Sequence, residues 1–191
     1  MPEAGRVIAG TARGIRLVAP GPGTRPLSDR VKQTLFAILA PDLPGSRFLD
    51  LFAGSGAAGI EALSRGAASA TFVERDHQAV QVIRTNLGRT NLAGPAARVV
   101  QADVVDFLRR DGPGEAAYDL VVVDPPYTET ELLRRVLDAL EPALDPGARV
   151  VAKHFWRDPP PARIGLLASD RARRFGDTML TFYRTEPGQE A

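Results

Sequence analysis

The sequence predicts an α/β protein with a mostly parallel, seven-stranded sheet, an antiparallel last strand and helices on both faces. An apolar run at Phe48–Phe52 leads into a glycine-rich loop, and an apolar-periodic segment then follows as far as Gly66. That order is typical of the opening of a βαβ unit. Strand-like and helix-like segments continue to alternate through residue 152, which favours a parallel sheet. The last two apolar runs meet at Gly176-Asp177, which predicts an antiparallel pair.

The N-terminal segment predicts a small appendage to this sheet. Two short β-prone runs within residues 6–18 indicate a hairpin, and Ser28 is placed to cap a helix. The expected domain boundaries are 1–45 for the hairpin and helix, 46–186 for the main domain and 187–191 for a frayed tail. The apolar face of the N-terminal helix consists of Val31, Leu35, Ile38 and Leu39.

The remaining elements follow from hydrophobic periodicity and from glycine and proline stops. The run Tyr118–Val123 is the most apolar, so we expect it at the centre of the sheet. The other predicted elements are a helix from Asp76 to about Arg89, a strand at Arg98–Gln101, a short helix around Val105–Leu108, a helix around Leu132–Leu140, and strands at Ala148–Ala152, Ile164–Phe175 and Thr178–Arg184.

Composition excludes several function classes. The 191 residues are 44% hydrophobic and 25% charged, as in a soluble globular protein, and no apolar run approaches the roughly 18 residues of a membrane span. The first residues lack the basic-then-apolar order of a signal peptide. Cysteine is absent and there are two histidines, so thiolate chemistry is excluded and a His-rich metal site is disfavoured. We therefore expect a cytoplasmic protein without a metal or a membrane association.

The glycine loop is compatible with two ligands. Residues 54–59 match the dinucleotide pattern G-x-G-x-x-G, and Glu74 follows 20 residues after Gly54, placed to bind ribose hydroxyls. Asp50, however, lies in the strand four residues before the loop. A carboxylate there opposes a pyrophosphate and suits a ligand with a cationic amino group. S-adenosylmethionine combines a ribose with such a group and carries no phosphate.

A second motif, Asp124-Pro125-Pro126-Tyr127, follows the fourth strand of the main domain, at the carboxyl edge where open α/β sheets bind ligands. The prolines stiffen the loop. An Asp carboxylate and a Pro carbonyl form a pair of acceptors for an exocyclic amine on a planar base, and Tyr127 offers a stacking surface. The alternative is a proline-stiffened turn with a solvent-facing Asp.

Charge is distributed unevenly along the chain. Residues 1–35 contain six basic and two acidic residues, residues 36–152 contain 11 and 16, and residues 153–184 contain seven and three. Two basic ends on an acidic body suggest a polyanionic partner. An arginine-rich solvated surface explains the same numbers, and charge alone does not separate the two.

These motifs carry a family resemblance. The Asp-Pro-Pro-Tyr motif resembles that of S-adenosylmethionine-dependent methyltransferases acting on exocyclic amines of nucleic-acid bases. Over about residues 6–184 the chain is similar to the bacterial family that methylates guanine N2 in 16S ribosomal RNA. The matching blocks are Arg6–Gly10 with Gly14–Leu17, Arg25–Phe36, Leu49–Gly56 and Glu61–Ala67.

The resemblance implies a Rossmann-like class I methyltransferase fold and a role for each site residue. Asp50 would orient the methionine ammonium, Glu74 would bind the ribose, and Asp103 would accept from the adenine amine. The implied cofactor residues are Asp50, Phe52, Ala53, Gly54, Ser55, Gly56, Glu74, Arg75, Asp103 and Val104. The implied catalytic residues are Asp124, Pro125, Pro126 and Tyr127, and the RNA-binding residues are Arg6, Arg13, Arg16, Arg25 and Arg30.

The implied partner is 16S ribosomal RNA within an assembling small subunit. Two positions depart from the family pattern: Gln33 stands where Glu is expected, and Lys153 where an acid is more usual. A DNA adenine-N6 methyltransferase shares the motif after the fourth strand and is the nearest alternative. Residues 54–59 alone leave a dinucleotide-dependent oxidoreductase open, and a non-catalytic RNA-binding protein is a further class.

Overall fold

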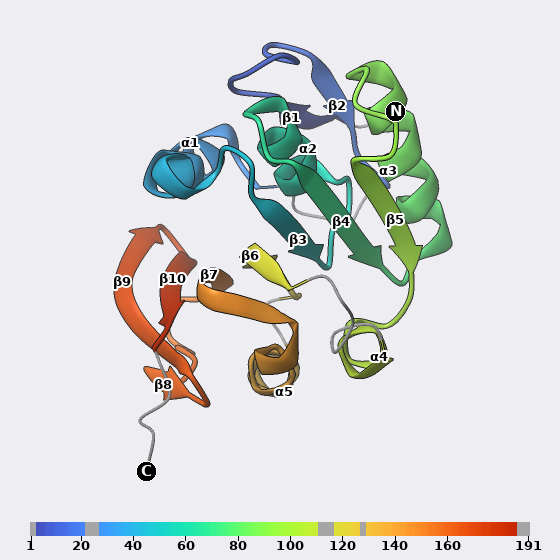
Figure 1. The fold of residues 1–191 in the computed structure, drawn as a ribbon. Helices are drawn as coiled ribbons and strands as arrows, with labels where there is room; N and C mark the ends of the chain where they lie inside the picture. Colours follow the sequence, from blue (N-terminus) through green and yellow to red (C-terminus); the bar gives the residue numbers. More distant parts are fainter. Residues whose placement is uncertain (1–2, 22–26, 111–116, 127–128, 187–191) are drawn as a thin grey trace. The chain divides into compact units, whose positions relative to one another are not determined.

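The computed structural model describes residues 3–21, 27–110, 117–126 and 129–186. The chain divides into two compact units, Met1–Asp103 (unit 1) and Val104–Ala191 (unit 2). Figure 1 shows the elements of each unit along the chain. The predicted tail, residues 187–191, lies outside the described residues, and the domain boundaries expected from the sequence stay a prediction.

Unit 1 contains three parallel strands in the order β5-β4-β3, preceded in the chain by an antiparallel hairpin. Each helix begins where the sequence provides a cap or a glycine: Ser28 caps α1 and Asp76 caps α3 through side-chain oxygens that accept backbone N–H groups. The elements are β1 (Glu3–Arg6), β2 (Arg16–Val18), α1 (Asp29–Leu39), η1 (Ala40–Asp42), β3 (Arg47–Leu51), α2 (Ala57–Ser64), β4 (Ser69–Glu74), α3 (His77–Arg89) and β5 (Ala97–Gln101).

The hairpin begins earlier than the sequence predicts, because buried side chains of α2 compete for its backbone. The N–H groups of Ile8 and Ala9 donate to the Glu61 carboxylate, at 2.7 and 3.0 Å, instead of to a paired strand. Glu61 is fully buried, so these bonds satisfy a charge that would otherwise be costly. The predicted first run of the hairpin is therefore a loop anchored to α2.

Asn86 on α3 attaches the second hairpin strand to the glycine loop. Its side chain exchanges two hydrogen bonds with the backbone of Val18, at 2.8 and 2.9 Å, and donates a third to the Ser55 carbonyl at 2.9 Å. The residue is fully buried. The N-terminal hairpin is thus fixed to the glycine loop through one side chain.

Unit 2 contains β6 parallel to β7, with β10 antiparallel to both β7 and β9. Figure 1 shows α4 and α5 next to each other within this unit. The elements are α4 (Val104–Arg110), β6 (Tyr118–Val123), α5 (Thr130–Ala139), η2 (Glu141–Ala143), β7 (Leu144–Phe155), β8 (Arg163–Ile164), β9 (Leu167–Phe175) and β10 (Thr178–Thr185).

Two strand predictions in unit 2 need correction. The strand expected at Ala148–Ala152 extends from Leu144 to Phe155, with an irregular register around Gly147. The strand expected at Ile164–Phe175 is two strands, since Gly165 adopts a φ of 53° and turns the chain between them. Among the described helices, none is both long and apolar enough to cross a membrane.

Candidate active site

The loop between β3 and α2 holds three residues in the left-handed region: Phe52 at φ 61°, Gly54 at 55° and Gly56 at 77°. Glycine adopts this region at little cost, whereas a bulky residue such as phenylalanine rarely does. Strain of this kind concentrates at ligand sites, because the surrounding structure must hold it. The strained Phe52 therefore marks the loop as a candidate binding site.

The third glycine of the motif serves packing instead. A Cβ on Gly59 would lie 2.3 Å from the Phe72 ring, so glycine is required for α2 to lie this close to β4. Asp50 is 2% exposed and accepts the Gly59 N–H at 2.9 Å. Asp50 thus fixes the first turn of α2 beneath the loop. Its effect on a ligand's ammonium group stays a prediction.

Glu74 ends β4 and faces the glycine loop from the neighbouring strand. Its carboxylate accepts the backbone N–H of Gly54 at 2.9 Å and that of Asp76, also at 2.9 Å. These bonds fall on different oxygens, so each oxygen keeps lone-pair capacity for a further donor. Glu74 is partly exposed. It can brace the loop and still receive the hydroxyl groups of a ribose.

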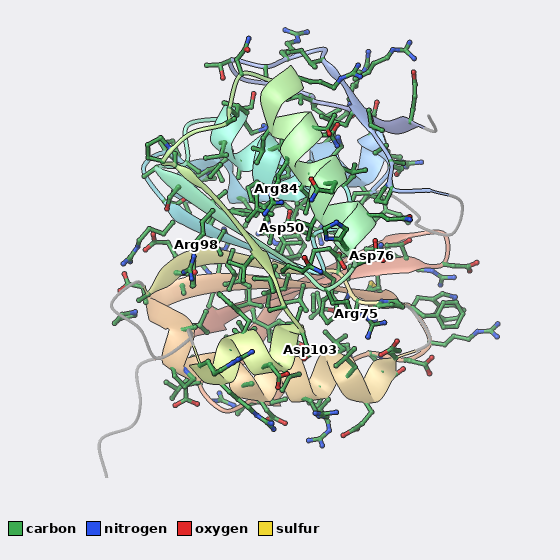
Figure 2. The ribbon with its side chains drawn as sticks, turned by 90° about the vertical axis from the view of Figure 1, so that its right-hand side faces the viewer. Asp50, Arg75, Asp76, Arg84, Arg98 and Asp103 are labelled. Carbon is green, nitrogen blue, oxygen red and sulfur yellow. The ribbon has the colours of Figure 1, made fainter. Side chains whose placement is uncertain are left out.

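The other predicted cofactor residues of unit 1 lie around the same strand ends. Arg75 and Asp103 are exposed, and Figure 2 shows them near the carboxyl ends of β4 and β5, with Arg98 towards the opposite end of β5. Ala53 and Ser55 are buried within the loop. Val104, the first residue of α4, is buried and belongs to unit 2.

The Asp124-Pro125-Pro126 segment follows β6 in unit 2. Asp124 Oδ1 accepts from Lys153 Nζ at 2.5 Å, and the two side chains are 18% and 9% exposed. Pro125 is buried and Pro126 is exposed; Tyr127 lies outside the described residues. A pocket beside this loop is lined by Pro125, Pro126, Glu129, Thr130, Leu133, Lys153, His154, Phe155 and Asp158.

Two opposed effects act on Asp124. Burial raises the pKa of its carboxyl, while the charge of Lys153 and the hydrogen bond from it lower that pKa. The net direction is upward. Lys153 thus favours the ionised carboxylate at a place where burial disfavours it.

Sequence reasoning treated Lys153 only as a departure from a family pattern. Strand register explains the contact. Val123, the last residue of β6, pairs with Ala152, so Asp124 directly after β6 lies next to Lys153 within β7. The signal available in the sequence was a lysine directly after the apolar run 150–152 and an aspartate directly after the apolar run 120–123.

The predicted RNA-binding arginines of unit 1 fall into two groups. Arg6 and Arg16 already form exposed ion pairs, with Asp29 at 3.2 Å and with Glu3 at 2.7 Å. Arg13 and Arg30 are exposed and have no ion pair within the described part of the chain, and Arg25 lies outside it.

Sequence reasoning also missed Lys32, which is fully buried and donates from Nζ to the Arg6 carbonyl. Burial lowers the pKa of Lys32, and the nearby Glu61 and Asp29 oppose that shift. Its role is to hold α1 against the first hairpin strand.

Within the described ranges, no group of three His, Asp or Glu side chains is placed to hold a metal ion.

The order of strands in the two units, with the glycine loop after β3 and an antiparallel β10 beside β7, is that of a class I methyltransferase, whose methyl donor is S-adenosylmethionine. The protein yhhF from Escherichia coli shares this fold with a TM-score of 0.81 and 36% identity, over 95% of this chain and 97% of that one. The predicted fold class is confirmed.

The sequence profile of the family described as "Conserved hypothetical protein 95" matches residues 5–184, and the chain belongs to this family. YlbH of Bacillus subtilis (strain 168) is 37% identical over 182 residues, covering 94% of this chain and 98% of that protein. "Ribosomal RNA small subunit methyltransferase D" of Escherichia coli (strain K12) is 44% identical over 137 residues, covering 71% and 66%. The resemblance predicted from the sequence is confirmed.

Proposed function

We propose that this protein transfers a methyl group from S-adenosylmethionine to the exocyclic N2 amine of a guanine in 16S ribosomal RNA. The observation that carries the proposal is the Asp124 carboxylate, held by Lys153 directly before two prolines. Membership of a family with a relative named ribosomal RNA small subunit methyltransferase D supports the substrate class. The choice of guanine N2 rests on the resemblance of the sequence motifs.

The residues of unit 1 fit the cofactor. Left-handed backbone at Phe52, Gly54 and Gly56 provides a tight loop, and Glu74 retains acceptor capacity for two ribose hydroxyls. Asp103, exposed after β5, is the candidate partner of the adenine amine. When bound, S-adenosylmethionine supplies an electrophilic methyl group on a sulfonium. These side chains orient it and take no part in proton transfer.

Asp124 acts on the amine that receives the methyl group. The N2 lone pair of guanine is delocalised into the ring, so the amine is a poor nucleophile. Hydrogen bonds from N2–H to Asp124 and to the Pro125 carbonyl favour a pyramidal nitrogen with its lone pair available. Because Lys153 occupies Oδ1 of Asp124, the second oxygen, Oδ2, remains for the amine.

Lys153 also matters for the proton that methylation releases. Transfer would form the N–C bond and break the methyl–sulfur bond, leaving S-adenosylhomocysteine as a neutral thioether. The amine nitrogen would then carry one proton in excess, and an ionised carboxylate hydrogen-bonded to it would be the first acceptor of that proton. Burial opposes that ionised state, and Lys153 favours it. We therefore assign Asp124 as the catalytic acceptor and Lys153 as the residue that positions and ionises it.

The target base must leave its stack before the amine can reach such a loop. Contacts with the RNA backbone supply part of that free energy and require cations. Among the predicted RNA-binding arginines in the described part of unit 1, Arg13 and Arg30 form no ion pair and are candidates for this role, whereas Arg6 and Arg16 are already paired. The hairpin that carries Arg13 is fixed to the cofactor loop through Asn86.

The test is tritiated-methyl transfer onto naked 16S RNA, RNA-only subunit particles and protein-loaded small subunits from a strain lacking this gene. Digestion of the labelled RNA to nucleosides should place the label in N2-methylguanosine. Label in a different nucleoside would contradict the base assignment. Transfer to DNA adenine, with none to RNA, would favour the DNA methyltransferase, and S-adenosylhomocysteine binding without transfer would favour a binding protein.

A further inference from the structure

Unit 2 carries four arginines and a tryptophan that do not line the pocket beside the Asp124 loop. We call this set, Trp156, Arg157, Arg171, Arg173 and Arg174, the arginine edge. All four arginines are exposed, and Trp156 is partly exposed. Trp156 and Arg157 lie in the turn after β7, and the other three arginines lie on β9.

The tryptophan holds two of the guanidinium groups in place. Cζ of Arg174 lies 3.7 Å from the centroid of the Trp156 ring, and Cζ of Arg157 lies 4.9 Å from it. Arg174 Nε also donates to the Gly176 carbonyl at 2.9 Å. A stacked guanidinium loses little conformational entropy when its remaining N–H groups bind an anion.

Strand register places arginines on both faces of this edge. Arg173 pairs with Leu180 and Arg174 with Met179, so successive side chains point to opposite faces. Arg171 and Arg173 share a face and are about 7 Å apart along the strand. From Asp170 to Phe175, β9 has no strand on its outer side among the described residues. An extended polyanion can therefore run along an open edge.

The arginines of the arginine edge differ from other arginines of unit 2 in their ion pairing. None of its four guanidinium groups forms an ion pair in the described ranges. The two other arginines of the same region do: Arg163 pairs with Glu186 at 2.7 Å and Arg184 with Asp170 at 2.9 Å. Neighbouring like charges repel one another, so an anion bound here would relieve that repulsion.

We propose that the arginine edge binds the phosphate backbone of the RNA substrate as a second docking surface, separate from the N-terminal hairpin. The proposal rests on the proposed function for the identity of the polyanion. The guanidinium groups of the arginine edge, two of them stacked on Trp156, can bind the phosphates of single-stranded or locally opened RNA. Such contacts do not depend on the base sequence. Charge complementarity favours RNA, because the surface offers guanidinium groups that form no ion pair in the described part of the chain.

A different role for these arginines is protection of the edge strand, since charged side chains discourage pairing with other chains. In that case their loss would promote association of the protein and leave its affinity for RNA unchanged. Size-exclusion chromatography and RNA binding therefore separate the two roles.

The experiment compares two double variants that remove the same number of charges from the same region. Arg173→Ala with Arg174→Ala removes unpaired arginines, whereas Arg163→Ala with Arg184→Ala removes arginines that already have carboxylate partners. Filter binding to 16S RNA at several salt concentrations should show the first variant weakened about tenfold. The slope of log affinity against log salt should fall by about one to two, with the control near wild type.

A third variant, Trp156→Leu, keeps every charge and removes the stacking surface, and it should weaken RNA binding by a smaller factor of about two to five. Methyl transfer at saturating RNA should be unchanged in all three variants. Equal RNA affinity and equal salt slopes in the two double variants would overturn the proposal. A wild-type protein that transfers no methyl group to RNA would instead contradict the proposed function.

Discussion

Glu74 is the last residue of the parallel strand β4, and Asp124 directly follows the parallel strand β6, but the surroundings of the two carboxylates differ. Glu74 is partly exposed and accepts two backbone N–H groups. The Asp124 side chain is 18% exposed, and its carboxylate accepts a hydrogen bond from the ammonium group of Lys153. A carboxylate bound by neutral N–H donors can still accept hydrogen bonds from hydroxyl groups. A carboxylate paired with a cation in a buried place has its pKa, and so its charge state, set by that cation. On the proposed function, Glu74 therefore binds the cofactor and Asp124 acts in the chemical step.

The largest effect on kcat should come from Asp124→Asn. The variant keeps the shape and an acceptor for Lys153 but loses the negative charge, so kcat should fall about 100- to 1000-fold. Calorimetry should show S-adenosylmethionine affinity within a few-fold of wild type. Asp124→Ala is less informative, because it leaves Lys153 without its carboxylate. A kcat near wild type in a folded Asn variant would refute the acceptor mechanism.

Glu74→Ala should act on cofactor affinity instead. Two hydrogen bonds to a charged acceptor, each about 1.5–3 kcal/mol, are lost, so the Kd for S-adenosylmethionine should rise by about 100- to 10,000-fold. The Gly54 N–H also loses its partner, which adds to the effect. Glu74→Gln keeps one carbonyl acceptor and serves as the matched control, with a smaller change. Unchanged affinity in both variants would remove Glu74 from the cofactor site.

Lys153→Met should lower kcat by about tenfold at neutral pH and change its pH profile. Removing the cation raises the pKa of the Asp124 carboxyl further, so the acid limb of kcat should move to higher pH. Lys153→Arg should restore much of the rate. His154, whose pKa is lowered by burial, lines the same pocket together with Glu129 and Asp158, so His154→Gln serves as the control for a second titration. An unmoved acid limb would separate Lys153 from catalysis.

A smaller effect separates the N-terminal arginines. Arg13 has no ion pair in the described part of the chain, whereas Arg16 is paired with Glu3. Arg13→Ala should therefore raise the KM for RNA by a few-fold and Arg16→Ala by less, and only the first should reduce the salt dependence of binding. Filter binding at several salt concentrations measures both. Equal effects would show that pairing within the hairpin is irrelevant to docking.

Hydrophobic periodicity was sufficient to predict most helices and strands, because most elements bury one face and end at a cap, a glycine or a proline. The first hairpin strand was misplaced because Glu61, more than 50 residues away, takes the N–H groups of Ile8 and Ala9. The split between β8 and β9 depends on a left-handed Gly165, which periodicity does not report. Local sequence patterns do not report hydrogen bonds between residues far apart in the chain, nor the backbone conformation of a single glycine.

The sequence was sufficient to predict which residues belong to the candidate site and that they lie at the ends of strands. It was not sufficient to predict the charged partners of these residues. Glu74 and Asp124 follow from their positions after apolar runs. The partner of Asp124 depends on which strands are neighbours and on their register, and a sequence pattern does not state either. Lys32 and Asn86 were missed for the same reason, since both are polar residues buried by contacts far along the chain.

The separate roles of Glu74 in cofactor binding and Asp124 in the chemical step are tested most directly by single-turnover methyl transfer to RNA. The rate is measured across a range of S-adenosylmethionine concentrations. We expect Glu74→Gln to reach nearly the wild-type rate once the cofactor is saturating, because only binding is impaired. Asp124→Asn should remain slow at every concentration. Full recovery of Asp124→Asn at high cofactor, or a Glu74→Gln rate that stays low at saturation, would contradict the account.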